Sequence, residues 1–332
     1  MCGLFSMASA VAGCSLGHSP YQLRRWKARQ LAFLMRYNCK RPGNRVGGDL
    51  WLERRTAPTL HRFGPASGRN LKGTMRIQSS RLGFSPSYTA LELVDSCVGA
   101  LAAEDPVLSG WHTGYVADHR VRIAHDLDII SQEIPRSNRV LEVGSIPLLL
   151  TASLVKLGYG VLGCDIAPER YYSTIRSLGL NVVKCNIETE RLPFEDASFD
   201  AVIFNELFEH LRINPIFTLS EMLRVLKPNG LLTVSTPNLK SLGGIKNFLI
   251  GDRAQSCSAN LHTEYTKLRT IGHMGHVREY TPTEVIEFLQ TIGFNVTAII
   301  FRGDYAGVTS RFLIRWVPRL SPFISYIARK PR

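Results

Sequence analysis

The feature that most constrains this chain is a regular alternation of strand-like and helix-like segments that begins near residue 110. Short apolar runs that end in glycine or a polar residue predict strands, and longer runs with an apolar residue every three or four positions predict helices. The predicted strands cover residues 139–143, 160–166, 181–187, 201–205, 231–235 and 294–301. The predicted helices cover residues 147–157, 168–178, 216–226 and 283–291, preceded by one that ends before Pro135. Such alternation is typical of an α/β fold in which a parallel sheet is covered on both faces.

The positive charge of the chain lies almost entirely in its first 85 residues. The whole chain has 40 Lys and Arg against 27 Asp and Glu, a net charge of +13. Residues 1–85 hold 15 of these cations and two acids, whereas the remaining 247 residues are balanced. Glycine, proline, arginine and serine are so frequent before residue 87 that little apolar surface can be buried to offset chain entropy. We predict a basic, largely disordered extension over residues 1–87 and a folded domain over residues 110–332 with no charge reason to bind nucleic acid.

The cysteines and the hydropathy pattern bear on location. The seven cysteines are odd in number and form no C-x-x-C pair, which favours a reducing compartment over a disulfide framework or a zinc ribbon. No stretch of 18 apolar residues predicts a membrane span. We therefore predict a cytoplasmic location. Two alternatives stay open for the extension, namely an organellar transit peptide and a basic arm that touches RNA or membrane.

Polar residues follow the predicted strands at the ends where open α/β sheets bind their ligands. The first strand ends in Glu142 and leads to Gly144, where a glycine lets the backbone approach a ligand. Asp165 ends the second strand, 21 residues after Gly144, a spacing at which a carboxylate accepts both hydroxyls of a ribose. The third strand ends in Asn186, whose amide can read an adenine edge, and the fourth ends in Asn205. Together these residues predict a pocket for an adenosine-containing cofactor.

Six short motifs follow one another at the predicted strand ends and turns. They are Val140-Leu141-Glu142-Val143-Gly144, Gly163-Cys164-Asp165-Ile166, Leu192-Pro193-Phe194-Glu195-Asp196-Ala197-Ser198-Phe199-Asp200, Asn205-Glu206-Leu207-Phe208-Glu209-His210-Leu211, Glu221-Met222-Leu223-Arg224-Val225-Leu226-Lys227-Pro228-Asn229-Gly230 and His276-Val277-Arg278-Glu279-Tyr280-Thr281. In this order, over about residues 115–302, the chain resembles the class I S-adenosylmethionine-dependent methyltransferases, in particular the ubiquinone-biosynthesis-like (methyltransferase type 11) branch. The resemblance implies a Rossmann-like three-layer sandwich. Its sheet would be mostly parallel and seven-stranded, with one antiparallel strand near the C-terminus.

The resemblance also implies S-adenosylmethionine as the cofactor and a set of residues that bind it. These residues are Glu142, Gly144, Ser145, Asp165, Ile166, Asn186, Ile187 and Asn205. Glu142 and Gly144 would lie near the methionine part of the cofactor, Asp165 at the ribose, and Asn186 with Ile187 beside the adenine.

Two departures from the family pattern bear on cofactor binding. Residues 145–148 read Ser-Ile-Pro-Leu where the family usually has further glycines, which narrows the space over the cofactor. Asn186 stands where an aspartate is commoner, and its carbonyl oxygen can still accept from the adenine amino group. The glycine-poor loop keeps open a second function, that of a non-catalytic binding or scaffold protein with this fold. A dinucleotide-dependent oxidoreductase is disfavoured because no G-x-G-x-x-G follows the first strand.

Methyl transfer from a sulfonium is an in-line displacement, so the protein must chiefly align the acceptor with the methyl group in a water-poor site. It requires no metal. A hydroxyl acceptor requires a base, and the candidate catalytic residues are His210, Glu206 and His276. Structural roles stay open for both histidines, because His210 can cap a helical turn and His276 can bond to the backbone. A weaker alternative is a metal site made of Cys257, His262, His273 and His276.

Two C-terminal segments bear on the acceptor and on membranes. Residues 238–280 are long for a loop, and we predict that they form a lid insertion on the acceptor side of the site. Their apolar and histidine content favours a small, partly apolar acceptor such as a lipid, quinone or glycolipid. Residues 312–317 are expected to form an edge strand, followed by a terminal helix. The alternative is that the cations at 311, 315 and 319 and the apolar residues between them touch anionic lipid in a peripheral membrane contact.

Overall fold

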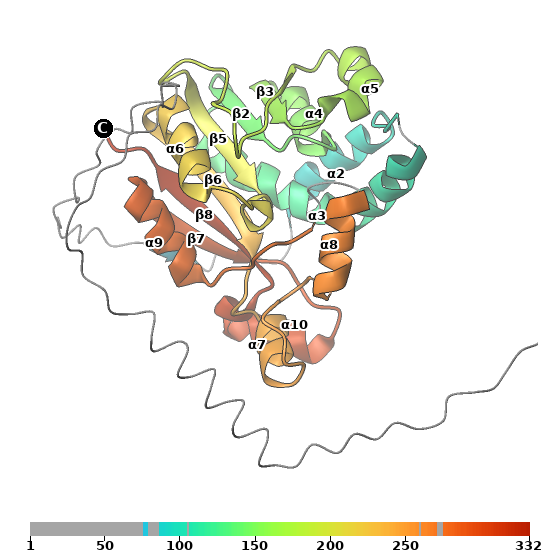
Figure 1. Cartoon of the computed structure of the whole chain (residues 1–332), viewed down its shortest axis with the longest axis vertical. Coiled ribbons are helices and arrows are strands. Elements are labelled where there is room, and N and C mark those ends of the chain that lie inside the picture. Colours follow the sequence, from blue (N-terminus) through green and yellow to red (C-terminus); the bar gives the residue numbers. More distant parts are fainter. Residues whose placement is uncertain (1–75, 79–85, 105, 259, 271–274) are drawn as a thin grey trace, which may run out of the picture. The chain divides into compact units, whose positions relative to one another are not determined.

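In the computed structural model, one mixed sheet is flanked by helices (Figure 1). The structure describes residues 76–78, 86–104, 106–258, 260–270 and 275–332, so most of the predicted extension lies outside the described residues. The strands are β1 (Arg76–Gln78), β2 (Arg139–Val143), β3 (Gly160–Asp165), β4 (Val182–Lys184), β5 (Phe199–Asn205), β6 (Leu226–Pro237), β7 (Asn295–Arg302) and β8 (Phe323–Arg329). Their order in the sheet is β1-β7-β8-β6-β5-β2-β3-β4.

The direction of the strands confirms the predicted Rossmann-like fold. β8 runs antiparallel to β6 and β7, and the other paired strands of the described sheet are parallel. The sheet has eight strands rather than the seven expected, because the short strand β1 pairs with β7 at one edge.

The helices lie where the sequence pattern places most of them. They are α2 (Tyr88–Val98), α3 (Pro106–Glu133), α4 (Leu149–Lys156), α5 (Tyr172–Ser177), α6 (Pro215–Val225), α7 (Leu242–Leu249), α8 (Leu261–Thr270), α9 (Pro282–Ile292) and α10 (Val308–Trp316), with short 3-10 turns at Pro168–Tyr171 (η2), Phe208–His210 (η3) and Pro318–Leu320 (η4). Local capping fixes several starts. Asn214 caps α6, and Thr281 with Glu284 forms a capping box on α9. None of the helices in the described part of the chain is long and apolar enough to cross a bilayer.

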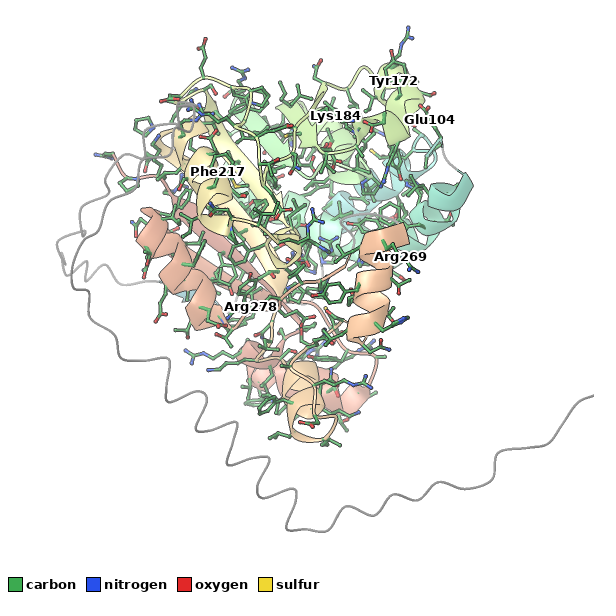
Figure 2. All side chains as sticks on the ribbon, in the orientation of Figure 1. Glu104, Tyr172, Lys184, Phe217, Arg269 and Arg278 are labelled. Carbon is green, nitrogen blue, oxygen red and sulfur yellow. The ribbon has the colours of Figure 1, made fainter. Side chains whose placement is uncertain are left out.

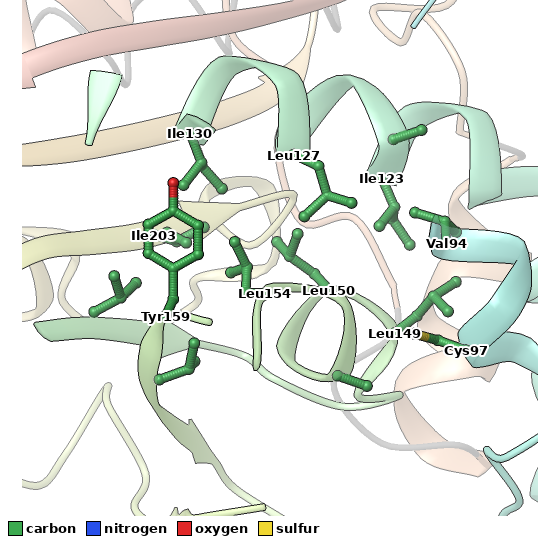
Figure 3. Packing of buried hydrophobic residues seen from close by; sticks show 14 of the residues in the cluster. Val94, Cys97, Ile123, Leu127, Ile130, Leu149, Leu150, Leu154, Tyr159 and Ile203 are labelled. Atoms are coloured by element: carbon green, nitrogen blue, oxygen red, sulfur yellow. The ribbon is translucent and has the colours of Figure 1, made fainter. Parts of the chain in front are cut away.

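Alternate residues of the strands face two separate apolar cores. Val140 on β2 packs with α2, α3 and α4, and its neighbour Leu141 packs on the opposite side with α6 and α9. This period of two is what a pleated strand imposes when both faces of a sheet are covered. Figure 3 shows the first core, where Val94 of α2, Leu127 of α3 and Leu150 of α4 converge. α2 and α3 begin before residue 110, and the predicted domain limits stay a prediction.

Two C-terminal expectations are wrong in their secondary structure. Residues 312–316 belong to helix α10, which Val317 caps, and not to an edge strand, because the apolar and basic side chains there recur at helical spacing. The expected terminal helix is wrong as well, because Phe323–Arg329 form the antiparallel strand β8, which lies inside the sheet between β6 and β7. The stretch 238–280 is less irregular than expected, since it contains α7 and α8. A serine cap at Ser241 starts α7, and its side chain accepts from the N–H of Gly244.

Candidate functional site

The polar strand ends meet at one edge of the sheet and surround a cavity of about 460 Å³. This volume lies within the range of about 300–1,000 Å³ that is typical of small-molecule sites. The cavity is lined by six of the predicted cofactor residues and by the three predicted catalytic residues, namely Gly144, Asp165, Ile166, Asn186, Ile187, Asn205, Glu206, His210 and His276. Helix α8, on which Figure 2 labels Arg269, adds Glu264 and Lys267 to the wall. The fold thus brings together side chains that are far apart in the sequence.

The remaining two predicted cofactor residues, Glu142 and Ser145, line an adjoining recess of about 40 Å³ and not the main cavity. Ser145 is buried, and its side chain lies against Gly163 of β3. Glu142 Oε2 accepts a hydrogen bond of 2.5 Å from the hydroxyl of Thr151 on α4. Gly144 and Asn205 line both spaces, so the recess and the cavity share a wall.

Glu142→Gln is expected to change how stability depends on pH. Burial raises the pKa of Glu142 to about 8, and the hydrogen bond from Thr151 only partly opposes this. An acid whose pKa is higher in the folded chain stabilises the fold fully below its ordinary value of 4.5, and this contribution is lost as the pH rises toward 8. The slope is about 1.4 kcal/mol per pH unit. In urea titrations, the free energy of unfolding should fall more steeply with rising pH for the wild type than for the variant. Parallel curves would contradict a buried, protonated Glu142.

The loop after β2 is held at the sheet edge by Asp165. Gly144 has a φ of 75°, and a Cβ there would collide with the side chain of Leu207. The N–H of Ile146 donates to Asp165 Oδ2 at 3.1 Å, and the N–H of Ala167 donates to Oδ1 at 2.9 Å. Burial raises the pKa of Asp165, and these two donors oppose the shift. Each carboxylate oxygen keeps a second lone pair, so Asp165 can also accept hydrogen bonds from a ligand.

The end of β4 supplies a second polar group beside apolar side chains. Asn186 Oδ1 accepts a hydrogen bond of 3.1 Å from the N–H of Glu188. Glu188 in turn accepts from the N–H of Ile213 at 2.8 Å, which ties this strand end to the segment after η3. Ile166 and Ile187 line the same part of the cavity wall as Asn186. A flat heterocycle with polar edges suits such a mixture of apolar surface and a few fixed polar groups.

A buried charged cluster was missed by the sequence reasoning. Arg302 ends β7 and is 1% exposed. Its Nη2 lies 3.2 Å from Asp126 Oδ1 on α3 and 3.2 Å from Glu206 Oε1. Arg122 Nη1, also on α3, lies 3.9 Å from the same oxygen of Glu206. Burial alone would raise the pKa of Glu206, but the charges of Arg122 and Arg302 hold it below its usual value. Glu206 is therefore an ionised partner of the two arginines.

Two signals in the sequence point to this cluster. Arg302 comes directly after the predicted strand 294–301, which is where a parallel sheet presents functional side chains. Helix α3 carries Trp111, Tyr115, His119 and Arg122 at helical spacing, and all four line the cavity. The hydroxyl of Tyr115 accepts from Arg122 Nη2 at 2.7 Å. The helix before the first motif therefore closes one side of the site.

His210 is neutral and has a defined proton position. Its Nδ1 lies 3.0 Å from the carbonyl oxygen of Gly275. Because a carbonyl only accepts, Nδ1 carries the proton and Nε2 carries the free lone pair. Burial, with the neighbouring charge of His276, lowers the pKa of His210 to about 4. The arrangement therefore offers a neutral imidazole nitrogen as a proton acceptor.

His276 is paired with a buried acid. Its Nδ1 lies 2.8 Å from the hydroxyl of Ser258 and 3.2 Å from Glu279 Oε1. Burial opposes a charge on His276, but the hydrogen bond to Glu279 and the charge of Glu209 raise its pKa above the usual value. The rings of His210 and His276 pack edge to face with their centroids 4.8 Å apart. The pKa values of the two histidines are thus shifted in opposite directions although their rings touch.

The same side chains have the chemistry of metal ligands. Among the residues that the structure describes, Glu209, His210 and His276 offer ligand atoms within 4.8 Å of one another, and so do Cys257, His276 and Glu279. Carboxylate and imidazole groups bind divalent cations. The weaker sequence alternative used a different set, of which His273 lies outside the described residues. These side chains can therefore hold a cation, or His210 can accept a proton.

Comparison with known proteins identifies the centre of the chain. Residues 141–234, which run from β2 into β6, match the family described as a methyltransferase domain. This match confirms the predicted resemblance over that part of the chain.

The curated proteins that are similar to this chain include two bacterial enzymes. The chain is similar to the ubiquinone biosynthesis O-methyltransferases of Xylella fastidiosa and Roseobacter denitrificans. Both are 34% identical, over 121 and 117 residues respectively. Each alignment covers 34% of this chain, with 47% of the first relative and 46% of the second. The chain therefore spans about half the length of the curated relatives it matches.

Solved structures with similar folds include two methyltransferases. A possible histamine N-methyltransferase from Thermotoga maritima is 19% identical, with a TM-score of 0.46, and the match covers 67% of this chain and 95% of that one. The 1,6-didemethyltoxoflavin-N1-methyltransferase of Burkholderia thailandensis, with bound S-adenosylhomocysteine, is 18% identical, with a TM-score of 0.45 and coverage of 74% and 89%.

Proposed function

We propose that this chain, whose residues 141–234 match the methyltransferase domain family, binds S-adenosylmethionine and methylates a hydroxyl oxygen of a small, quinone-like acceptor. The observation that carries this proposal is the shared lining of the cavity at the strand ends. Asp165 and Asn186 line it together with Glu206 and His210. Groups suited to an adenosine and groups suited to handling a proton therefore share one space.

The side chains present fit the proposed cofactor. Asp165 would hold the ribose, and Asn186 with Ile187 would flank the adenine. Two buried atoms that have no hydrogen-bond partner among the described residues, Asn205 Oδ1 and Arg122 Nε, suit the amino and carboxylate groups of the methionine end. Both residues line the wall shared by the cavity and the recess. Asn205 and Arg122 line both spaces even though the loop at residues 145–148 lacks further glycines.

The nature of the acceptor is inferred from the cavity wall and the relatives. Trp111, Leu211 and Phe323 add apolar surface to the lining, which suits a partly apolar ring. The curated relatives are named for O-methylation in ubiquinone biosynthesis. Among the predicted lipid, quinone and glycolipid acceptors, a quinone-like hydroxyl therefore fits best. The cytoplasmic location stays a prediction.

The residues of the chain would align the acceptor and take up its proton. S-adenosylmethionine supplies a methyl group activated by a positive sulfur. Nε2 of His210 accepts the proton of the acceptor hydroxyl as the oxygen gains the methyl group. Glu279 holds His276, whose ring packs against that of His210. Glu206 pairs with Arg122 in the cavity wall and with Arg302.

His210→Asn is expected to lower kcat by about 10²–10⁴-fold while leaving the Kd for S-adenosylhomocysteine nearly unchanged. An asparagine amide can still donate to the carbonyl oxygen of Gly275, but it has no counterpart of Nε2. The measurements are methyl transfer to a short-chain catechol and calorimetric titration of S-adenosylhomocysteine. His262→Asn, the same change at an exposed histidine of α8, is the matched control and should alter neither value.

Treatment with EDTA separates a base from a metal ligand. If His210 accepts a proton directly, the wild type keeps its activity after EDTA and dialysis. Activity that is lost with EDTA and restored by magnesium or zinc would assign His210 to a cation and contradict the proposed role. Binding of S-adenosylhomocysteine without turnover of any hydroxyl acceptor would favour the non-catalytic alternative.

A further inference from the structure

We propose that helices α7 and α10 together form a docking face for an anionic lipid bilayer. This face, called the α7–α10 face, consists of residues 240–253 and 304–319. Nine of the eighteen large apolar side chains that are exposed within the described ranges lie on it. They include Phe248, Leu249, Ile250, Phe312 and Trp316. Exposed apolar side chains gathered in this way mark an interaction surface.

Hydrogen bonds join the two helices into one surface. Asn238, just before α7, donates from Nδ2 to the carbonyl oxygens of Arg319 at 2.9 Å and Ser321 at 2.8 Å, just after α10. The N–H of Gly243 in α7 donates to the hydroxyl of Tyr305, just before α10, at 3.2 Å. Figure 1 shows α7 and α10 next to each other beyond the edge of the sheet. The face is therefore built from segments about 60 residues apart in the sequence.

The apolar side of α10 points away from the protein. Ile314 is the one buried residue of this helix, all of whose residues are described. Trp316 is 74% exposed and Val308 is 79% exposed. The rings of Phe312 and Trp316 lie 5.9 Å apart, so they form a continuous aromatic surface. Tryptophan, phenylalanine and leucine on a helix beside basic residues are typical of helices that lie in a membrane interface.

The charge of the face favours an anionic bilayer as its occupant. Residues 240–253 and 304–319 hold two acids, Asp252 and Asp304, and Asp304 is paired with Arg311 at 3.2 Å. Their cations are Lys240, Lys246, Arg253, Arg311, Arg315 and Arg319. Basic side chains next to an apolar surface are attracted to anionic headgroups. A second copy of the chain would present the same cations across a two-fold axis, so a symmetric dimer would bring like charges together.

The α7–α10 face is joined by short segments of the chain to the wall of the cavity. Pro237, which precedes the turn into α7, and Phe323, which follows η4 after α10, both line the cavity. A bilayer on this face would therefore lie close to one wall of the cavity proposed to hold an apolar acceptor. This link to the acceptor rests on the proposed function, whereas lipid binding itself does not.

The test is co-sedimentation of the full-length protein with vesicles of phosphatidylcholine containing about 30% phosphatidylglycerol, without cofactor. The double variant Phe312→Ser, Trp316→Ser should lower the partition coefficient by on the order of tenfold for each aromatic removed. The double variant Arg315→Gln, Arg319→Gln should bind vesicles more weakly than the wild type, and its binding should fall less steeply with rising salt concentration. The double variant Tyr172→Ser, Ile216→Ser removes two large exposed side chains elsewhere and should bind like the wild type. The basic N-terminal residues are present in every variant, so the differences report the face.

Three results decide the proposal. Quenching of fluorescence by brominated lipid that disappears in Trp316→Phe would place this side chain in the bilayer. Vesicle binding by Phe312→Ser, Trp316→Ser that equals the wild type would overturn the proposal, and so would self-association that this variant abolishes without any vesicle binding. Urea denaturation of the same variants with a midpoint equal to that of the wild type confirms that they are folded. A failure of methyl transfer leaves the lipid result standing, so the two proposals fail independently.

Discussion

Asp165→Ala is expected to weaken the binding of S-adenosylhomocysteine by about 10²–10⁴-fold. A carboxylate that accepts two hydrogen bonds from a ribose contributes about 1.5–3 kcal/mol for each of them, and tenfold in Kd corresponds to about 1.4 kcal/mol. The variant also removes the acceptor for the N–H of Ile146, so the loop after β2 would lose its tie to β3. Calorimetric titration measures the change directly.

Two further variants make this prediction specific. Asp165→Asn keeps one acceptor oxygen and should bind with intermediate affinity. Asp200→Ala removes an aspartate near the start of β5, at the end of the strand opposite to Asn205. Asp200 accepts a hydrogen bond from the N–H of Arg139 at 2.8 Å. It should leave the Kd unchanged. An affinity of Asp165→Ala within about threefold of the wild type would show that the ribose is held elsewhere, and the proposed cofactor site would then be wrong.

Arg302→Met is expected to lower the free energy of unfolding by about 3–5 kcal/mol. Breaking a buried ion pair by removing one partner leaves an uncompensated charge, which is far more costly than losing an exposed pair. Here the change would remove the ion-pair partner of Asp126, which is 2% exposed, and would leave Glu206 with the more distant Arg122 and the hydroxyl of Ser235. Burial already raises the pKa of Asp126, and Arg302 opposes that shift. Urea denaturation near neutral pH measures the loss.

The control for this prediction is an exposed ion pair that joins α3 to α2. Arg120 lies 2.6 Å from Asp95, and both side chains are about two-fifths exposed. Arg120→Met should therefore cost no more than about 1 kcal/mol. Adding Asp126→Leu to Arg302→Met should restore much of the lost stability, because an apolar side chain can replace a buried charge. A loss below about 1 kcal/mol for Arg302→Met alone would show that the cluster does not depend on this arginine.

The layered fold and the polar residues at the strand ends follow from local sequence pattern. Short, nearly continuous apolar runs define β2, β3 and β5, and each run stops at the residue that carries the chemistry, as at Asp165 and Asn205. In a parallel sheet these ends share one edge, so the pattern along the chain also predicts proximity in space. The prediction weakens at the C-terminus. There, the apolar content of residues 312–317 suits a strand, but their apolar side chains recur at helical spacing. Residues 312–316 form the end of helix α10.

The sequence by itself therefore determined the α/β class and the residues at the strand ends, because both depend on periodicities of a few residues. Only the tertiary structure decided which distant residues complete the site. Arg302 meets Asp126 across about 176 positions of the chain, and the carbonyl of Gly275 sets the proton of His210 across 65 positions. The α7–α10 face likewise exists only because β8 inserts between β6 and β7 and draws the segments before α7 and after α10 together. Such contacts depend on how packed layers bring separate segments together, and no local pattern of side chains records that arrangement.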